Sequence, residues 1–240
     1  MKPILRKNLS EDARNALYQY ILDMDLTAST KLPAEVELAA GLGVSRVTLR
    51  RALDDLEYSG VLLRLHGKGT FVNPSALQIR VDLSRMQEFG EIIQKSGHRS
   101  EMEVLSVQQR QADPFDTGRS EHVLQVEKLY RADGIPAILS VAQIPAFIFH
   151  TPPDSAAWGL HSNFELLHTC GGRVILRDKL EIATYTVREL LAERPALGSF
   201  PCASVLSLSG CGFDQHNQPV IHGTAYYNTD LITFNILRHT

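Results

Sequence analysis

The sequence predicts an α+β chain of two domains: a small helical domain that ends in a β-hairpin, and a mainly antiparallel sheet with short helices. Apolar residues recur at helical spacing within residues 1–73, whereas residues 81–240 contain strand-length apolar stretches separated by turn residues. With 240 residues, 44% of them hydrophobic, each domain can bury a core of its own. Residues 74–80 begin with Pro74-Ser75 and are predicted to form the linker.

Two helices are predicted before residue 43. The first starts at Ser10, a favourable N-cap residue, and Leu17 and Ile21 then follow at helical spacing. Pro33 suits the start of a second helix, which we expect over residues 34–42. The glycines around residue 42 then predict a tight turn.

A third helix and a hairpin complete the first domain. Ser45 is a favourable cap for a helix that extends to about Ser59, and its apolar residues are expected to be buried: Val47, Leu49, Leu53 and Leu56. Two short apolar stretches, 61–65 and 69–72, flank a glycine-rich tip and predict the hairpin.

The second domain alternates predicted strands with short helices. The helices are expected over residues 82–94, 163–169 and 187–193, and the spacing of Ser162 and Glu165 predicts a capping box. The strands are expected over residues 103–108, 122–130, 137–144, 173–186, 205–213, 220–227 and 233–237. Turn sequences between consecutive strands favour antiparallel pairing.

The charge of the chain is unevenly distributed. The net charge is −3, but residues 1–72 hold 10 Lys and Arg against 9 Asp and Glu, so the acidic excess lies in the second domain. The basic residues of the first domain also cluster, in and just after the third helix: Arg46, Arg50, Arg51, Arg64 and Lys68. A locally basic domain ahead of a mildly acidic one is compatible with DNA binding and a separate sensor.

Other features of the composition exclude several classes of protein. The three cysteines are widely spaced, which argues against a disulfide framework and a structural zinc site: Cys170, Cys202 and Cys211. The N-terminus lacks the apolar segment of a secretory signal, and no apolar stretch is long enough to span a membrane. We therefore expect a cytoplasmic protein with no cofactor, no metal and no membrane partner.

The third predicted helix has the chemistry of a DNA-recognition helix. Its first turn is polar, which suits base edges and phosphates, while its apolar side can pack on the other helices. Arginine at positions such as 46 and 50 can pair through its planar fork with guanine O6 and N7. Gly67-Lys68-Gly69 leads into a strand rather than a helix, so we interpret it as a hairpin tip and not as a nucleotide-binding loop.

The segment from Leu32 to Val72 resembles the DNA-binding domain of the GntR regulator family, especially its HutC subfamily. The matching motifs are Leu32-Pro33-x-Glu35 with Glu37-Leu38-Ala39, Gly43-Val44-Ser45-Arg46-x-Thr48-Leu49-Arg50-Arg51-Ala52-Leu53, and Gly67-Lys68-Gly69-Thr70-Phe71-Val72. The resemblance implies a winged helix-turn-helix and these DNA-binding residues: Glu35, Ser45, Arg46, Thr48, Arg50, Arg51, His66, Gly67, Lys68 and Gly69. Many members carry arginine where this chain has Val36, which implies one DNA contact fewer.

The second domain is similar to the UTRA domain, the effector-binding half of HutC-type regulators, whose fold resembles chorismate lyase. The motifs that carry this resemblance are Ser84-x-x-x-Glu88-Phe89, Leu129-Tyr130-Arg131-Ala132-Asp133-Gly134-Ile135-Pro136, Gln143-Ile144-Pro145 and Tyr226-Tyr227-x-x-Asp230-x-x-x-Phe234. The family's pocket positions fall here on Ser84, Lys128, Tyr130, Ser140, His222 and Tyr227. His222 in an apolar strand also fits a core position, and Lys128 also fits a surface position.

The pocket positions suggest an unusual effector. In sugar-phosphate sensors of this family, two arginines and a glutamate occupy positions near Lys128, Tyr130 and Ser140. A single lysine can still hold one anionic group as a point charge. We therefore expect a small-molecule effector that differs from a sugar phosphate and carries one acidic group.

Together these features predict a sequence-specific transcription regulator, a repressor whose operator affinity changes when a metabolite binds the second domain. The resemblance implies a homodimer joined through the second domains and an inverted-repeat operator in double-stranded DNA. Two alternatives stay open: a constitutive DNA-binding dimer without a ligand, and a lyase-like enzyme. Against the enzyme, no paired acid and base and no nucleophile motif stand out, so we expect no catalytic residues.

Overall fold

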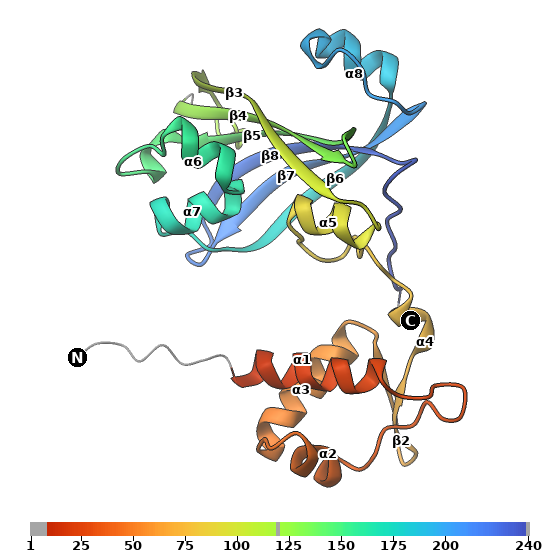
Figure 1. The fold of residues 1–240 in the computed structure, drawn as a ribbon. Coiled ribbons are helices and arrows are strands. Elements are labelled where there is room, and N and C mark those ends of the chain that lie inside the picture. The colour runs from red at the N-terminus through yellow and green to blue at the C-terminus, as the bar shows by residue number, and fades with distance from the viewer. Residues whose placement is uncertain (1–8, 119–120, 239–240) are drawn as a thin grey trace, which may run out of the picture. The chain divides into compact units, whose positions relative to one another are not determined.

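The computed structural model describes residues 9–118 and 121–238, and the chain divides into two compact units (Figure 1). One unit extends to Asp82 and also includes the last segment from Asn235, and the other is Leu83–Phe234. Residues 1–8, where we expected no secretory signal, lie outside the described part of the chain.

Three helices form the core of the first unit. They are α1 (Leu9–Leu22), α2 (Glu35–Gly41) and α3 (Arg46–Tyr58), close to the bounds that the sequence predicts. Their apolar faces meet in one buried cluster, to which α1 and α3 contribute most: Ala13, Leu17, Ile21, Leu49, Ala52, Leu53 and Leu56. This cluster fixes α3 from behind and leaves its other face in solvent.

Val47 is not part of this core, although the sequence analysis expected it to be buried. Its exposed fraction is 65%, whereas that of Leu49 is 0%. Two residues along a helix are separated by about 200° of rotation, so Val47 and Leu49 lie on opposite faces. The prediction for Val47 was therefore wrong, and this side chain belongs to the solvent-facing surface of α3.

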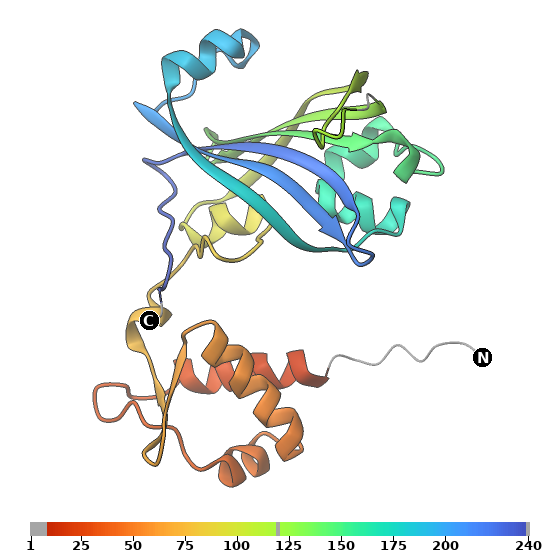
Figure 2. The ribbon, with the colours of Figure 1, turned by 180° about the vertical axis from the view of Figure 1, so that it is seen from behind.

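The predicted hairpin is present as β1 (Leu62–Leu65) and β2 (Gly69–Val72), paired antiparallel (Figure 2). A third extended segment lies beside β2, because Leu32 N donates to Thr70 O at 2.9 Å and Val72 N donates to Thr30 O at 2.7 Å. These bonds attach the hairpin to the chain that precedes α2.

The ends of the first unit differ from the sequence predictions. The predicted linker holds a short helix, α4 (Pro74–Leu77). No strand forms over residues 233–237; instead Asn235 N donates to Val81 O at 2.9 Å, and Leu237 packs against the core of the first unit. The final residues therefore group with the first unit, whereas the sequence analysis assigned them to the second domain.

A six-stranded antiparallel sheet forms the second unit, in the order β3-β4-β5-β8-β7-β6. The strands are β3 (Ser100–Ala112), β4 (Glu121–Ala132), β5 (Ile135–Pro145), β6 (Ile175–Thr186), β7 (Ser204–Asp214) and β8 (Pro219–Asn228). The α+β class that the sequence predicts is therefore confirmed. Strands β3 and β6 lie at the two edges of the sheet.

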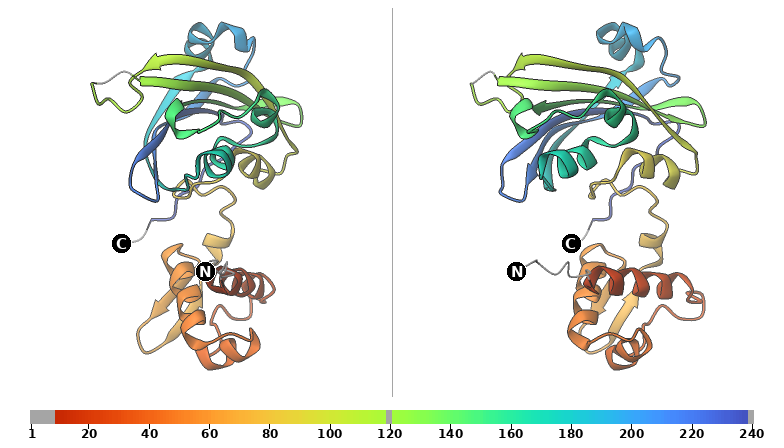
Figure 3. Two further views of the ribbon diagram at one scale, coloured as in Figure 1. Left: turned by 90° about the vertical axis from the view of Figure 1, so that its left-hand side faces the viewer. Right: turned by 60° about the vertical axis from the view of Figure 1, so that its left-hand side comes forward.

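Four helices and two short 3-10 turns accompany the sheet (Figure 3). The helices are α5 (Phe89–Lys95), α6 (Ser155–Leu160), α7 (Asn163–Gly171) and α8 (Val187–Glu193), and the 3-10 turns are Ala146–Ile148 and Pro195–Leu197. Ser162 caps α7, because its Oγ accepts from Glu165 N at 3.0 Å. Only this half of the predicted capping box is formed, and the Glu165 carboxylate lies 3.0 Å from Nδ1 of His161. Helix α6 is not among the helices that the sequence predicts.

Helix α5 begins seven residues later than the predicted start at residue 82. Asp82 forms an isolated parallel bridge with Asn235, and residues 83–88 form turns and irregular backbone. This segment connects the extended bridge to α5 and so cannot continue the helix.

The two faces of the sheet carry different helices. On one face, α6 and α7 pack on apolar residues of β4, β5 and β8. On the other, Leu190 of α8 packs with Leu129, Leu139 and Val141. Among the described helices the longest, α1, has 14 residues, and none combines the length and apolarity that a bilayer crossing requires.

Candidate DNA interface and effector cavity

The first turn of α3 is capped and polar. Ser45 Oγ accepts from Thr48 N at 3.1 Å, and the two hydroxyl groups lie 2.8 Å apart. This cap stabilises the start of the helix and satisfies one of its free amides. The predicted DNA-contacting residues of this helix face solvent, with Thr48 half-buried: Ser45, Arg46, Thr48, Arg50 and Arg51.

Helices α2 and α3 are joined by an ion pair between two predicted DNA-binding residues. Arg50 Nε donates to Glu35 Oε2 at 2.8 Å. The Arg50 side chain is 67% exposed, so the pair contributes little to stability. Its effect is on orientation, because a guanidinium held at Nε still has both terminal nitrogens available for a guanine.

The hairpin tip presents polar groups at a glycine-rich turn. Gly67 and Gly69 have φ values of +73° and +116°, a region that side chains with a Cβ rarely adopt. Between them Lys68 donates its amide to Leu65 O at 2.9 Å, and its side chain and that of His66 are exposed. The tip can therefore bring backbone amides and one positive charge close to a phosphate.

The structure adds residues that the sequence analysis did not include. Lys31 lies beside the hairpin: its Nζ is 6.0 Å from the centroid of the Phe71 ring, and its Cε would be 3.1 Å from a Cβ on Gly69. Val47 extends the exposed edge of α3 with an apolar group, and Val36 is 52% exposed on α2. A lysine just before the Leu-Pro motif was the only sequence signal for Lys31.

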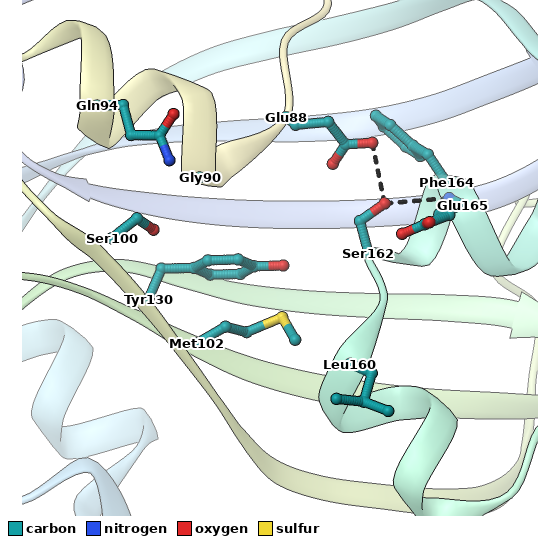
Figure 4. A pocket seen from close by; sticks show the side chains of 10 residues that line it. All are labelled: Glu88, Gly90, Gln94, Ser100, Met102, Tyr130, Leu160, Ser162, Phe164 and Glu165. Carbon is teal, nitrogen blue, oxygen red and sulfur yellow. Dashed lines mark hydrogen bonds between the residues drawn. The ribbon is translucent and has the colours of Figure 1, made fainter.

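A cavity of about 640 Å³ lies in the second unit, between α5, the start of α7 and the strands β3 and β4 (Figure 4). Its lining residues are Glu88, Gly90, Gln94, Ser100, Met102, Tyr130, Leu160, Ser162, Phe164 and Glu165. This volume is typical of a small-molecule site. Of the six predicted effector-binding residues, only Tyr130 is among them.

Ser162 connects two carboxylates at the cavity. Its Oγ donates to Glu88 Oε1 at 2.9 Å and accepts from the amide of Glu165, as Figure 4 shows. Burial raises the pKa of Glu88, and the hydrogen bond from Ser162 opposes that rise. The Glu165 carboxylate is exposed and lies 3.0 Å from Nδ1 of His161.

Three other predicted effector residues share the face of the sheet on which Tyr130 lies. Lys128 pairs with Ser140 across β4 and β5, and the register places Tyr227 of β8 in line with Tyr130. All three are buried, so they form the floor behind the cavity rather than its lining. The Phe89 ring packs between the two tyrosines, with centroids 5.1 Å from Tyr130 and 6.1 Å from Tyr227.

The side chain of Lys128 is buried and contacts other groups of the chain. Its Nζ donates to the His161 carbonyl at 2.6 Å and lies 5.6 Å from the centroid of the Trp158 ring. Desolvation lowers the Lys128 pKa to about 8, although Glu88 and Glu165 both act to raise it. The surface position that the sequence left open for Lys128 is excluded, because its exposed fraction is 0%.

The structure does not place His222 and Ser84 with the other four predicted effector-binding residues. His222 pairs with Gln143 on one side and Cys211 on the other, so it lies on the opposite face of the sheet from Lys128 and Tyr130. Burial lowers its pKa. Ser84 is exposed in the turn region that precedes α5. The pleat therefore separates His222 from the predicted pocket.

Sequence reasoning missed most of the cavity lining. Glu88 stood in the motif that carried the resemblance, and Ser162 and Glu165 stood in the predicted capping box, but neither pattern marks a ligand site. Among the residues that the structure describes, no group of three His, Cys, Asp or Glu side chains is placed to hold a metal ion.

An exposed basic helix edge with a hairpin wing, and a separate domain with a small-molecule cavity, define a transcription regulator that binds DNA and responds to a ligand. Comparison with family models agrees: residues 9–72 match the bacterial regulatory proteins of the gntR family, and residues 95–233 match the UTRA domain. The chain belongs to the GntR family, in the group whose second domain is UTRA. These are regulators, not enzymes.

Individual relatives match over nearly the whole chain. The Escherichia coli K12 protein named "Probable fructoselysine utilization operon transcriptional repressor" is 26% identical over 97% of this chain and 92% of its own length. The transcriptional repressor NagR of Bacillus subtilis strain 168 is 25% identical over 95% of this chain and 96% of its own length.

Solved structures share the fold. YydK of Bacillus subtilis, described as a possible transcriptional regulator, superposes with a TM-score of 0.75 at 19% identity, covering 96% of this chain and 99% of its own. PhnF of Mycobacterium smegmatis has a TM-score of 0.55 at 23% identity, with 95% and 99% coverage.

Proposed function

We propose that this chain represses transcription as a homodimer on an inverted-repeat operator, and that a small effector in the second unit weakens this binding. The exposed, capped first turn of α3 carries the proposal, because its arginines are the side chains best suited to reading guanine. Two relatives are named as repressors, which supports repression rather than activation.

In this proposal α3 enters the major groove of one half-site. Arg46 and Arg50 read base edges, with Glu35 holding Arg50 in position. The remaining predicted residues contact the sugar-phosphate backbone, which positions the helix without reading sequence: Ser45, Thr48, Arg51, His66, Gly67, Lys68 and Gly69. Lys31 adds a charge beside the wing.

The edge strand β6 supports a dimer formed by two copies of the chain. It lies at the end of the sheet and exposes three apolar side chains, Leu176, Leu180 and Ile182. A long exposed apolar edge is usually covered in native proteins. In an antiparallel pairing centred on Leu180, Lys179 faces Glu181 of the second copy in both directions, which makes the edge self-complementary.

Effector binding changes operator affinity in this proposal by favouring one of two domain arrangements. Two recognition helices match both half-sites only at one spacing, so a ligand that prefers the other arrangement releases the operator. The cavity is the site that we assign to this ligand. Lys128 was predicted to hold an anionic group of the ligand, but its ammonium donates to a backbone carbonyl of the chain instead.

A gel-shift experiment with DNA from upstream of the chain's own gene tests the proposal. We expect a retarded complex that resists competition by unrelated DNA, with protection of two symmetric half-sites in a footprint. A metabolite panel should contain compounds that weaken the complex. A complex that no metabolite alters would favour the constitutive DNA-binding dimer, and the absence of specific retardation would contradict the proposal.

A further inference from the structure

The charged groups that line the cavity of the second unit restrict the charge of a ligand that can bind there. This inference rests on the proposed role of the cavity as the effector site. Two of the described lining residues, Glu88 and Glu165, are carboxylates, and this lining contains no lysine, arginine or histidine. A ligand that enters the cavity therefore meets negative charge first.

Lys128, which interacts electrostatically with the two carboxylates of the lining, does not reverse this charge. Lys128 is fully buried, and its ammonium donates to the His161 carbonyl at 2.6 Å. It acts electrostatically on both Glu88 and Glu165. Lys128 offsets part of the charge of the two carboxylates, and His161 Nδ1 lies 3.0 Å from Glu165 Oε2. Neither side chain lines the cavity, so the charged groups among its described lining residues are the two carboxylates.

The start of α7 does not offer an anion site either. The N-terminus of a helix attracts anions through its free amides. Here Ser162 Oγ already accepts from Glu165 N, and the carboxylate of Glu165 is in the first turn. Ser162 also donates to Glu88, so this hydroxyl is directed at a carboxylate of the chain itself.

The rest of the lining is apolar or neutral. Met102, Leu160 and Phe164 supply apolar surface, and Tyr130 presents its ring from β4 (Figure 4). Burial holds the pKa of the Tyr130 hydroxyl above its usual range, so that group stays neutral. This surface suits the carbon skeleton of a ligand.

We propose that the effector is a small organic cation whose ammonium group lies between Glu88 and Glu165 and whose apolar part packs on Met102, Leu160 and Phe164. This replaces the anionic effector expected from the sequence. An ammonium group beside two carboxylates is stabilised, and an anion of similar size is repelled by the same groups.

Three probes of similar size, each with one phenyl ring, test the charge preference in the full-length protein: benzylammonium, neutral benzyl alcohol and benzoate. Binding is measured by saturation-transfer NMR titration at neutral pH. We expect benzylammonium to bind roughly tenfold more tightly than benzyl alcohol, and benzoate to bind most weakly. Equal or tighter binding of benzoate, or no binding by any probe, would overturn the proposal.

Isosteric variants connect the preference to the two carboxylates. Glu88→Gln keeps an oxygen that can accept from Ser162, and Glu165→Gln changes an exposed residue. We therefore expect each single variant to fold, so that its ligand binding can be measured. Both should reduce the preference for benzylammonium over benzyl alcohol, and the double variant should abolish it. A preference that persists in the double variant would also overturn the proposal.

Glu101→Gln is the matched control. It makes the same charge change on β3, but on the opposite face from the cavity residues Ser100 and Met102, and should leave the preference unchanged. The unfolding of each variant, followed by the fluorescence of the single tryptophan, Trp158, shows whether the second unit is folded. Operator binding is measured separately, so failure of the DNA-binding proposal is distinguishable from failure of the charge assignment.

Discussion

Arg50 Nε donates to Glu35 Oε2 at 2.8 Å, so a base-reading arginine on α3 is held by an acid on α2. Because the pair is exposed, we expect it to contribute to operator recognition rather than to folding. An acid close to DNA is unfavourable by itself, since it repels phosphates. Its presence is explained if it restricts the conformations of the arginine before binding.

Replacing Glu35 tests this positioning role. Glu35→Ala should lower the ratio of specific to non-specific binding while leaving the stability of the domain nearly unchanged. We expect a loss of about 0.5–1 kcal/mol in specific binding, comparable to fixing one flexible side chain. The measurement is a double-mutant cycle with Arg50→Ala. If the two changes are independent, or if non-specific affinity falls as well, Glu35 does not act through Arg50.

Val47 is expected to contact the methyl group of a thymine. Its exposed side chain lies in the first turn of α3, and apolar side chains at such positions pack against the thymine methyl. Replacing single thymines of the operator with uracil should cost the wild type about 0.8 kcal/mol at one position, the value of one methyl group. Val47→Ser should show no loss at that position. An unchanged uracil profile in the variant would exclude Val47 from the readout.

The β6 edge is expected to hold the dimer together. Leu180→Lys places two positive charges opposite each other at the centre of the proposed pairing, and should yield a monomer in light-scattering measurements. Operator affinity should fall because two half-sites are no longer bound together. Leu105→Lys is the control, since Leu105 is also 40% exposed but lies on the opposite edge strand, β3. If Leu180→Lys remains a dimer, another surface forms the interface.

Lys128 is expected to make the stability of the second unit depend on pH. Its pKa is about 8 in the folded chain and 10.5 in the reference state, so the unfolded chain binds more protons between these values. The contribution of Lys128 to stability should therefore rise between about pH 8 and 10.5. The shift corresponds to an upper limit of about 3.5 kcal/mol, at about 1.4 kcal/mol per pKa unit.

Urea unfolding followed by Trp158 fluorescence at several pH values measures this dependence. Lys128→Met removes the titrating group, so the free energy of unfolding of the wild type should increase relative to that of the variant as the pH rises through that range. The fluorescence reports the second unit alone, because the single tryptophan of the chain lies there. A constant difference across the range would mean that Lys128 keeps the same protonation in both states.

Most of the DNA-binding unit could be predicted from the sequence because its signals are local. The cap at Ser45, the helix breaks and the glycines of the hairpin each act within a few residues. Val47 was predicted to be buried from its apolar character alone. Its spacing of two residues from Leu49 places it on the opposite, solvent-facing side of the helix. The attachment of the C-terminal segment could not be predicted, since it depends on a contact between residues 81 and 235.

The cavity was less accessible to sequence reasoning because it combines segments far apart in the chain. Glu88 and Ser162 are 74 residues apart, and only the packing of α5 and α7 brings them together. One error was avoidable: Tyr227 and His222 differ by an odd number of residues, so a regular strand places them on opposite faces. Lys128 is buried on the same face of the sheet as Tyr130, and its ammonium donates to the His161 carbonyl, a contact that its place in the sequence does not indicate.

The central claim is that α3 reads a specific DNA sequence through its exposed arginines. The most direct test is fluorescence anisotropy of the full chain with its own upstream DNA and with a scrambled duplex, for the wild type and Arg50→Ala. The account predicts that Arg50→Ala loses roughly 1–3 kcal/mol of specific binding, with little change on the scrambled duplex. Wild-type affinity and specificity in Arg50→Ala would contradict it.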